Sequence, residues 1–186
     1  MRKLFGGMVL AALALSLPAT AMAQRRAAAP AGGAKHEFGV DLGLAYAKPS
    51  GGDGGIEIGT PVDVRFGIVS RGELMWEPRL NFQLSSVGGE TQYIITPDVN
   101  VLYATSPGRH RNGMYFTGGA GLVLVDLGAG PASSGTAFQF NGGIGWRKPY
   151  EGAAWRYELG FRWTSESDVT ASTIEIGGRI GISLWH

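Results

Sequence analysis

From His36 to the end of the chain, apolar residues alternate with polar or small residues with a period of two. The clearest run is 155–163, where aromatic residues and one leucine occupy every second position, and Arg, Glu and Gly stand between them. A period of two places successive side chains on opposite faces of a β-strand and does not fit the 3.6-residue period of an α-helix. The sequence therefore predicts an all-β protein, and no segment after Ala23 indicates a helix.

Turn-forming segments rich in Gly, Pro, Ser and Asp interrupt this alternation, and eight strands of about ten residues are expected between them. The expected strands are 38–46, 56–68, 74–84, 93–103, 114–125, 138–147, 155–163 and 174–184. Consecutive strands with short links form an antiparallel meander that can close as an up-and-down barrel. Pro61, Pro78 and Pro97 fall inside strands, where we expect β-bulges because proline has no N–H to donate.

Composition excludes several other classes. The 186 residues include 31 glycines, no cysteine and a formal net charge of +1. Without cysteine there is no disulfide scaffold, Cys-based metal site or thiol nucleophile. The near-neutral charge gives no reason to expect a nucleic-acid partner. The length fits a single domain.

The first residues have the form of a targeting sequence. Arg2 and Lys3 precede the apolar run 8–17, and Ala21-Met22-Ala23 has the small-x-small pattern of a signal-peptidase site. The apolar run is well short of the ~20 residues that a membrane-spanning helix needs. We expect residues 1–23 to be a signal peptide, 24–35 a disordered periplasmic tail rich in Ala, Gly and Pro, and 36–186 the barrel.

Alternation alone fits both a soluble barrel with an apolar interior and a membrane barrel with the reverse arrangement. The polar phase is rich in glycine, and its positive residues are all arginine. The lumen of an eight-stranded barrel is just wide enough for side chains, so small residues beside long paired ones fit inside it. The expected interior charge network is Asp41, Glu57, Asp63, Arg65, Glu77, Arg79, Asp98, Arg147, Arg156, Glu158, Arg162, Glu175 and Arg179.

Aromatic residues of the apolar phase lie mainly near the strand ends. Two aromatic belts around an aliphatic band are typical of the two interfaces of a bilayer. The expected girdle residues are Phe38, Tyr46, Trp76, Tyr93, Tyr103, Phe116, Trp146, Trp155, Tyr157 and Trp163. A strand of about ten residues, tilted by ~45°, spans close to the ~25 Å apolar band of an outer membrane. These features favour the membrane barrel.

The strand number, the N-terminal signal and the final strand resemble the small outer-membrane barrels of the OmpA transmembrane domain and OmpX type. The resemblance implies a polar-x-Gly-x-x-hydrophobic-x-aromatic assembly signal, which Arg179, Gly181 and Leu184 match. His186 stands where the family usually has phenylalanine or tryptophan, and Trp185 lies one residue out of phase. The implied surroundings are outer-membrane lipid and lipopolysaccharide, with the barrel assembly machinery as partner during biogenesis and a monomeric state.

No constellation of residues indicates catalysis or metal binding. His36, His110 and His186 are expected at the periplasmic end, without triad or metal-ligand spacing, and we interpret them as solvated. We therefore expect no cofactor, no metal site and no enzymatic activity. The interior charges are interpreted as a plug of the lumen, although ionisable groups at membrane depth are also candidates for an ion path.

The favoured function is a non-enzymatic integral outer-membrane barrel that contributes to envelope integrity or surface interaction. Two alternatives stay open at this point. One is a soluble, lipocalin-like periplasmic carrier of an apolar ligand, and the other is a lipid A-modifying outer-membrane enzyme.

Overall fold

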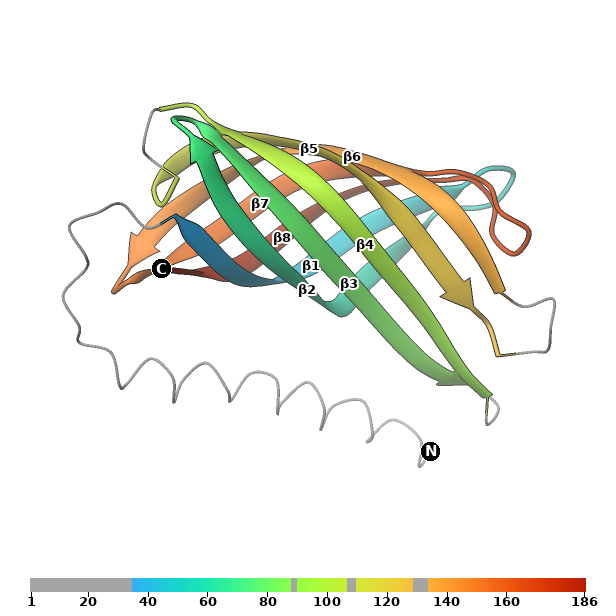
Figure 1. Ribbon diagram of the computed structural model, residues 1–186. Helices are drawn as coiled ribbons and strands as arrows, with labels where there is room; N and C mark the ends of the chain where they lie inside the picture. The colour runs from blue at the N-terminus through green and yellow to red at the C-terminus, as the bar shows by residue number, and fades with distance from the viewer. Residues whose placement is uncertain (1–34, 88–89, 107–109, 129–133) are drawn as a thin grey trace. The chain divides into compact units, whose positions relative to one another are not determined.

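The chain forms a closed barrel of eight antiparallel strands in the computed structural model (Figure 1), which describes residues 35–87, 90–106, 110–128 and 134–186. The strands are β1 (His36–Pro49), β2 (Gly55–Arg71), β3 (Leu74–Val87), β4 (Glu90–Ala104), β5 (Gly113–Asp126), β6 (Ser134–Tyr150), β7 (Ala153–Thr164) and β8 (Thr173–Trp185). Each strand pairs with its neighbours in the chain, and β1 also pairs with β8. The predicted up-and-down barrel is confirmed.

Some of the sequence lies beyond these ranges. The expected signal peptide, 1–23, and all of the expected tail except Lys35 are outside the described residues. Within the strands, the side chains of 56–62, 71, 84–87 and 90–91 are not described either. No helix among the described residues is long and apolar enough to cross a membrane.

The strands are longer than the sequence predicts. They have 12 to 17 residues, and β6, with 17, continues past the apolar run into polar residues at both ends. Ladder hydrogen bonds between backbones do not require an apolar pattern, so alternation marks only the part of each strand that has one apolar face.

The two ends of the barrel differ in what they hold. The terminal end holds His36 and Trp185, together with the turns β2–β3, β4–β5 and β6–β7; the loop end holds the other four connections. In the β6–β7 turn, Glu151 and Gly152 both have positive φ, 46° and 99°. Two such residues fit the type I′ geometry that matches the twist of paired strands.

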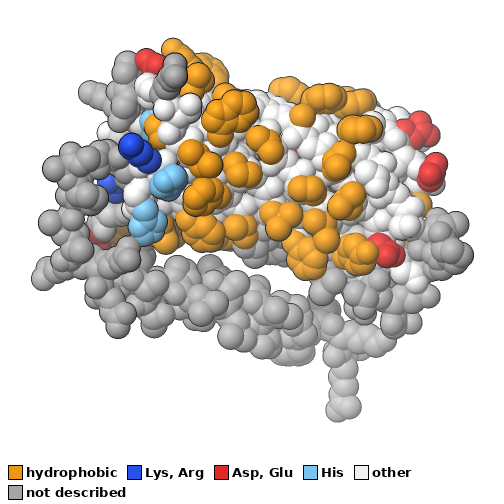
Figure 2. Space-filling view, viewed as in Figure 1, with side chains coloured by type: hydrophobic (Ala, Val, Ile, Leu, Met, Phe, Trp, Pro, Cys, Tyr) orange, Lys and Arg blue, Asp and Glu red, His pale blue; other side chains and the backbone are white. Residues whose placement is uncertain are grey.

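Apolar side chains cover the outside of the barrel. Leu159 and Phe161 on β7 are 58% and 55% exposed, whereas Arg156 and Glu158, in the alternate phase of the same strand, are 1% and 7% exposed. Figure 2 shows hydrophobic side chains over the barrel wall and charged side chains gathered at its two ends. The arrangement is the reverse of a soluble protein, and the prediction of a polar, charge-paired interior is confirmed.

The three prolines inside strands behave in two ways. Near Pro61 the pairing of β1 with β2 shifts from Asp41↔Asp63 to Gly43↔Gly59, so the expected bulge is present on β2. At Pro78 and Pro97 the expectation is wrong, because the β3–β4 register runs through both without a shift. Instead, the pairing of β3 with β2 is interrupted beside Pro78, and the pairing of β4 with β5 is interrupted beside Pro97. After each short gap the register resumes unchanged. A missing donor is therefore tolerated without an inserted residue.

Candidate functional site

The large polar side chains can enter the lumen because glycines on the neighbouring strands leave room for them. A Cβ on Gly39 of β1 would clash with the guanidinium of Arg65, and a Cβ on Gly145 of β6 would clash with the ring of Tyr115. Large side chains therefore lie flat across neighbouring strands. This is the role that the sequence predicts for glycine in the polar phase.

Eight buried charged residues form one connected cluster, which we call the lumen network. Its members are Glu37, Asp41, Arg65, Glu77, Arg79, Arg147, Arg156 and Glu158. Four are carboxylates and four are guanidiniums, so the network is neutral as a whole. Buried charges are tolerated when they are paired and hydrogen-bonded in this way.

Glu77 on β3 is the centre of the lumen network. Its carboxylate lies 2.6 Å from both Arg79 and Arg156, 3.6 Å from Arg147 and 3.7 Å from Arg65. The Glu77 side chain is fully buried. Four guanidiniums from four strands thus share one carboxylate.

Ion pairs of the network connect opposite walls of the barrel. Arg156 on β7 binds Glu77 on β3 at 2.6 Å, and Arg79 on β3 binds Glu158 on β7 at 2.9 Å. Arg147 on β6 reaches Glu37 on β1 at 2.6 Å, and Glu37 also contacts Arg65 on β2. Side chains that cross the lumen in several directions fill it, as a plug does.

Apolar residues close the lumen at the terminal end. Met75, Leu102, Tyr115 and Trp185 form a buried cluster there. The Arg147 guanidinium lies over the ring of Tyr115 at 4.6 Å and the ring of Trp185 at 5.4 Å, which joins this cluster to the lumen network. Trp185, which is out of phase with the proposed assembly signal, therefore points into the barrel.

His110 in the β4–β5 turn adds to this closure. It is 5% exposed, and its Nε2–H donates a hydrogen bond to the Gly72 carbonyl at 2.7 Å. The Arg147 guanidinium donates to the His110 carbonyl at 3.1 Å. The interpretation of His110 as solvated is wrong, because the residue is buried between the Gly72 carbonyl and Arg147. His36 and His186 are exposed, and His36 stacks on Phe66 at 5.8 Å.

Acid is expected to weaken the barrel through His110. Burial lowers the pKa of the His110 imidazole below its ordinary value, although the hydrogen bond to Gly72 acts in the opposite direction. The unfolded chain therefore binds a proton at this imidazole more readily than the folded chain does. The stability that neutral His110 contributes is complete above about pH 6.5, the unfolded pKa, and is lost as the pH falls from there through the folded pKa. His110→Gln should therefore unfold with a shallower pH dependence between pH 7 and pH 5, measured by tryptophan fluorescence.

His36→Gln is the matched control for this measurement, since it removes an exposed histidine at the same end. Its pH dependence should equal that of the unaltered protein. A His110→Gln variant with an unchanged pH profile would contradict the role given to the buried ring.

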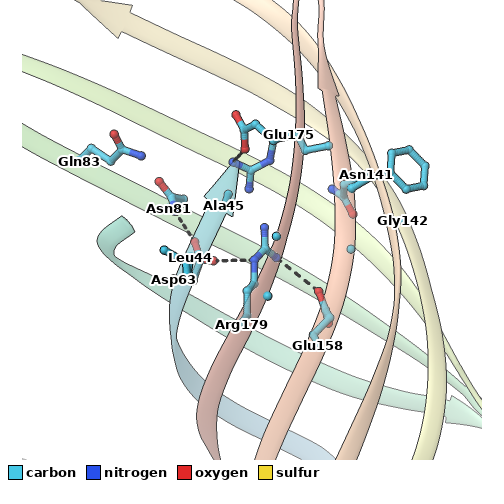
Figure 3. A pocket seen from close by; sticks show the side chains of 16 residues that line it. Leu44, Ala45, Asp63, Asn81, Gln83, Asn141, Gly142, Glu158, Glu175 and Arg179 are labelled. Atoms are coloured by element: carbon cyan, nitrogen blue, oxygen red, sulfur yellow. Dashed lines mark hydrogen bonds and ion pairs between the residues drawn. The ribbon is translucent and has the colours of Figure 1, made fainter. Parts of the chain in front are cut away.

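Toward the loop end, the lumen is hollow. A cavity of about 90 Å³ lies there, lined mainly by polar side chains and glycines (Figure 3). Its ion pairs are looser than those of the lumen network. Arg179 lies 3.4 Å from both Asp63 and Glu158, and Arg162 lies 3.4 Å from Glu175. The side chains of Arg162, Glu175 and Arg179 also keep some exposure.

Asp98 on β4 is hydrogen-bonded by side-chain amides. It accepts hydrogen bonds from Asn100 at 2.5 Å, Gln139 at 3.0 Å and Asn141 at 3.5 Å. Among the side chains that the structure describes, no arginine lies within ion-pair distance of Asp98. Its neighbour across the β3–β4 ladder, Arg79, turns instead toward Glu77 and Glu158.

Every residue of the predicted interior charge network whose side chain the structure describes faces the lumen. The side chain of Glu57 is not among the described ones. Glu37 was missed because it precedes the first expected strand. The sequence pattern assigns Met75, Leu102, Tyr115 and Trp185 to neither face; extending the polar phase of each strand to its end places all four inside.

The proposed girdle residues are all exposed on the outer surface: Phe38, Tyr46, Trp76, Tyr93, Tyr103, Phe116, Trp146, Trp155, Tyr157 and Trp163. In the proposed assembly signal, Arg179 and Gly181 face the lumen and Leu184 faces outward. Within the described part of the chain, no group of three or more His, Asp or Glu side chains could hold a metal ion.

A closed eight-stranded barrel with an apolar outside and a charge-paired lumen defines a class: the chain has the fold of the small outer-membrane β-barrel proteins. Among solved structures, Neisserial surface protein A is similar over 81% of this chain and 97% of its own, with a TM-score of 0.55 and 12% identity.

Two other solved structures show weaker similarity. The attachment invasion locus protein Ail of Yersinia pestis has a TM-score of 0.47 and 9% identity, covering 80% of this chain and 98% of its own. The N-terminal β-barrel domain of Pseudomonas aeruginosa OprF has a TM-score of 0.43 and 9% identity, covering 78% and 97%. No protein-family model matches the sequence, and no curated protein matches it.

Proposed function

We propose that this protein is an integral outer-membrane barrel without enzymatic activity, which contributes to envelope integrity or to interactions at the cell surface through its loops. The observation that carries the proposal is the inverted surface. Large apolar residues are exposed all around the wall, while arginines and carboxylates are buried inside. Such a surface is stable in lipid and would aggregate in water.

The fold of Neisserial surface protein A supports the same location. In this orientation the terminal end faces the periplasm and the four loops face outward, as is usual for outer-membrane barrels. The outward loops are short, so any surface that binds a partner is small. The plugged terminal half supports a structural role in preference to a pore.

The two alternatives are less well supported. A soluble carrier of an apolar ligand needs an apolar interior, whereas the described lumen holds the network of ion pairs. A lipid A-modifying enzyme that relies on a histidine needs it near the outer leaflet. All three histidines of the sequence lie instead at the terminal end.

Membrane fractionation tests this proposal. The protein should appear in the outer-membrane pellet, withstand carbonate washing, and change its mobility on SDS gels when it is boiled, because a closed barrel unfolds only on heating. A known soluble periplasmic protein in the same cells serves as the fractionation control. Recovery of the protein in the soluble periplasmic fraction would refute the membrane location.

Analysis of lipid A tests the enzymatic alternative separately. Expression of the protein should leave the mass spectrum of lipid A unchanged. A mass shift that depends on the protein would show a lipid A-modifying activity.

A further inference from the structure

The charges of the described lumen do not balance in its hollow half. The lumen network has four carboxylates and four guanidiniums, and its Glu158 also lies 3.4 Å from Arg179 outside it. Outside it, the described lumen holds three carboxylates, Asp63, Asp98 and Glu175, and two guanidiniums, Arg162 and Arg179, which pair with Glu175 and Asp63. One negative charge is therefore in surplus among the described side chains.

Asp98 accounts for this surplus. It is 6% exposed, and the hydrogen bonds that it accepts from described side chains all come from amides, with no ion-pair partner. Gly121 on β5 lets Asp98 pack closely against this strand, because a Cβ there would lie 2.5 Å from the Cβ of Asp98. A buried carboxylate without an ion-pair partner is costly, so a further positive charge nearby is favoured.

The same region has oxygen acceptors without donors. Asn81 is 6% exposed and lines the cavity, and its Oδ1 accepts no hydrogen bond from the described protein. Its amide nitrogen donates to Asp63 at 2.5 Å, which leaves the oxygen free to bind something else (Figure 3). The amide oxygens of Asn100 and Gln139, beside Asp98, are likewise unpartnered.

Asn141 connects these two groups. It lines the cavity, and its amide donates to Asp98. The cavity thus lies next to the surplus carboxylate and is bordered by the Asp63 carboxylate and the Asn81 amide oxygen. Carboxylate and amide oxygens are the ligands that hard cations prefer.

We propose that the hollow half of the lumen binds one compact monovalent cation, an alkali-metal ion or an ammonium ion, held by Asn81 and Asp63, with Asp98 supplying the balancing charge. A single surplus negative charge matches one positive charge. Two guanidiniums, Arg162 and Arg179, line the same cavity and disfavour a divalent ion. The cavity volume of about 90 Å³ leaves room for a small ion, and a bulky organic cation fits it less well.

Thermal unfolding of the folded barrel in detergent tests the proposal, independently of the proposed location in the membrane. Unfolding midpoints are compared at one ionic strength in NaCl, KCl, NH₄Cl and N-methylglucamine chloride, whose bulky cation fits the cavity less well. The midpoint should be about 2–5 °C higher in the salts of the small cations, because a ligand that binds only the folded state stabilises it. The ordering of sodium, potassium and ammonium identifies the preferred ion.

Two variants locate the site. Asp98→Asn removes the surplus charge, and Asn81→Leu removes the amide oxygen without changing any charge. Both should lose the difference between small and bulky cations. Asp168→Asn is the matched control, since it removes an exposed carboxylate on the β7–β8 loop, and it should keep the full response. Soaking crystals in rubidium chloride should give an anomalous peak in the cavity.

Three results would overturn the proposal. Equal midpoints of the unaltered protein in all four salts would show that no cation binds. A larger response to CaCl₂ or MgCl₂ at the same ionic strength would assign a divalent ion. A full response in Asn81→Leu would place the ion elsewhere. The salt series needs only the unaltered protein, so a failure of Asp98→Asn to fold leaves the test intact.

Discussion

Glu77→Gln should lower the free energy of unfolding by about 3–5 kcal/mol, because it breaks buried ion pairs and leaves their partners without a counter-charge. Arg79 and Arg156 each lie 2.6 Å from the Glu77 carboxylate, and both are almost fully buried. Amide oxygens can still accept hydrogen bonds, but they cannot neutralise two guanidiniums. Urea unfolding of the barrel, followed by tryptophan fluorescence, measures the loss.

Glu175→Gln provides the matched control. The Glu175 carboxylate lies 3.4 Å from Arg162, and the two side chains keep 21% and 14% exposure. An ion pair that water can reach contributes at most about 1 kcal/mol. If the two substitutions destabilise the barrel equally, the lumen network does not have the central role that its geometry indicates.

Leu159→Arg should lower the stability of the membrane-inserted barrel by about 2–4 kcal/mol. Leu159 lies at the middle of β7, faces outward and is 58% exposed, so in a bilayer the new guanidinium would sit near the midplane. Folding into lipid vesicles, followed by the shift between folded and unfolded bands on gels, measures the effect.

An arginine introduced near a strand end is the control, because it shows whether the cost depends on depth in the membrane or on the added charge alone. Ile174 on β8 is 54% exposed and lies one residue from the loop end of its strand. Ile174→Arg should cost about 0–1 kcal/mol, since the penalty falls toward the interface. Equal costs at both positions would mean that the outer surface is not embedded in lipid.

Much of this fold can be predicted from the sequence, because a period of two assigns each residue to a face and a meander has few ways to close. The assignment succeeds where the pattern is regular, as at Arg156 and Leu159 on β7. Which carboxylate pairs with which arginine inside the lumen could not be predicted. Arg79 and Glu158 are 79 residues apart and meet only because β3 and β7 face each other across a closed barrel. Many other pairings of acids and arginines satisfy the same pattern.

The errors share a physical cause. Residue type alone predicts a solvated His110, and the pattern assigns Trp185 to neither face, yet both lie inside the terminal end. Their positions depend on how the turns and the chain ends fold over the lumen, which periodicity does not describe. The proline predictions failed at Pro78 and Pro97 because a strand with two neighbours can lose a hydrogen bond on one side and keep its register on the other.

The pairing of β1 with β8 constrains how the protein can fold. Hairpins between consecutive strands involve nearby residues and can form early, whereas this seam joins the first strand to the last and has the highest loop-closure cost. A chain interrupted before Thr173 would keep two unpaired sheet edges, along β1 and β7, and would be prone to aggregate through them. Completion of this barrel therefore depends on the arrival of its C-terminal segment, and any factor that protects the nascent chain has to shield two edges until then.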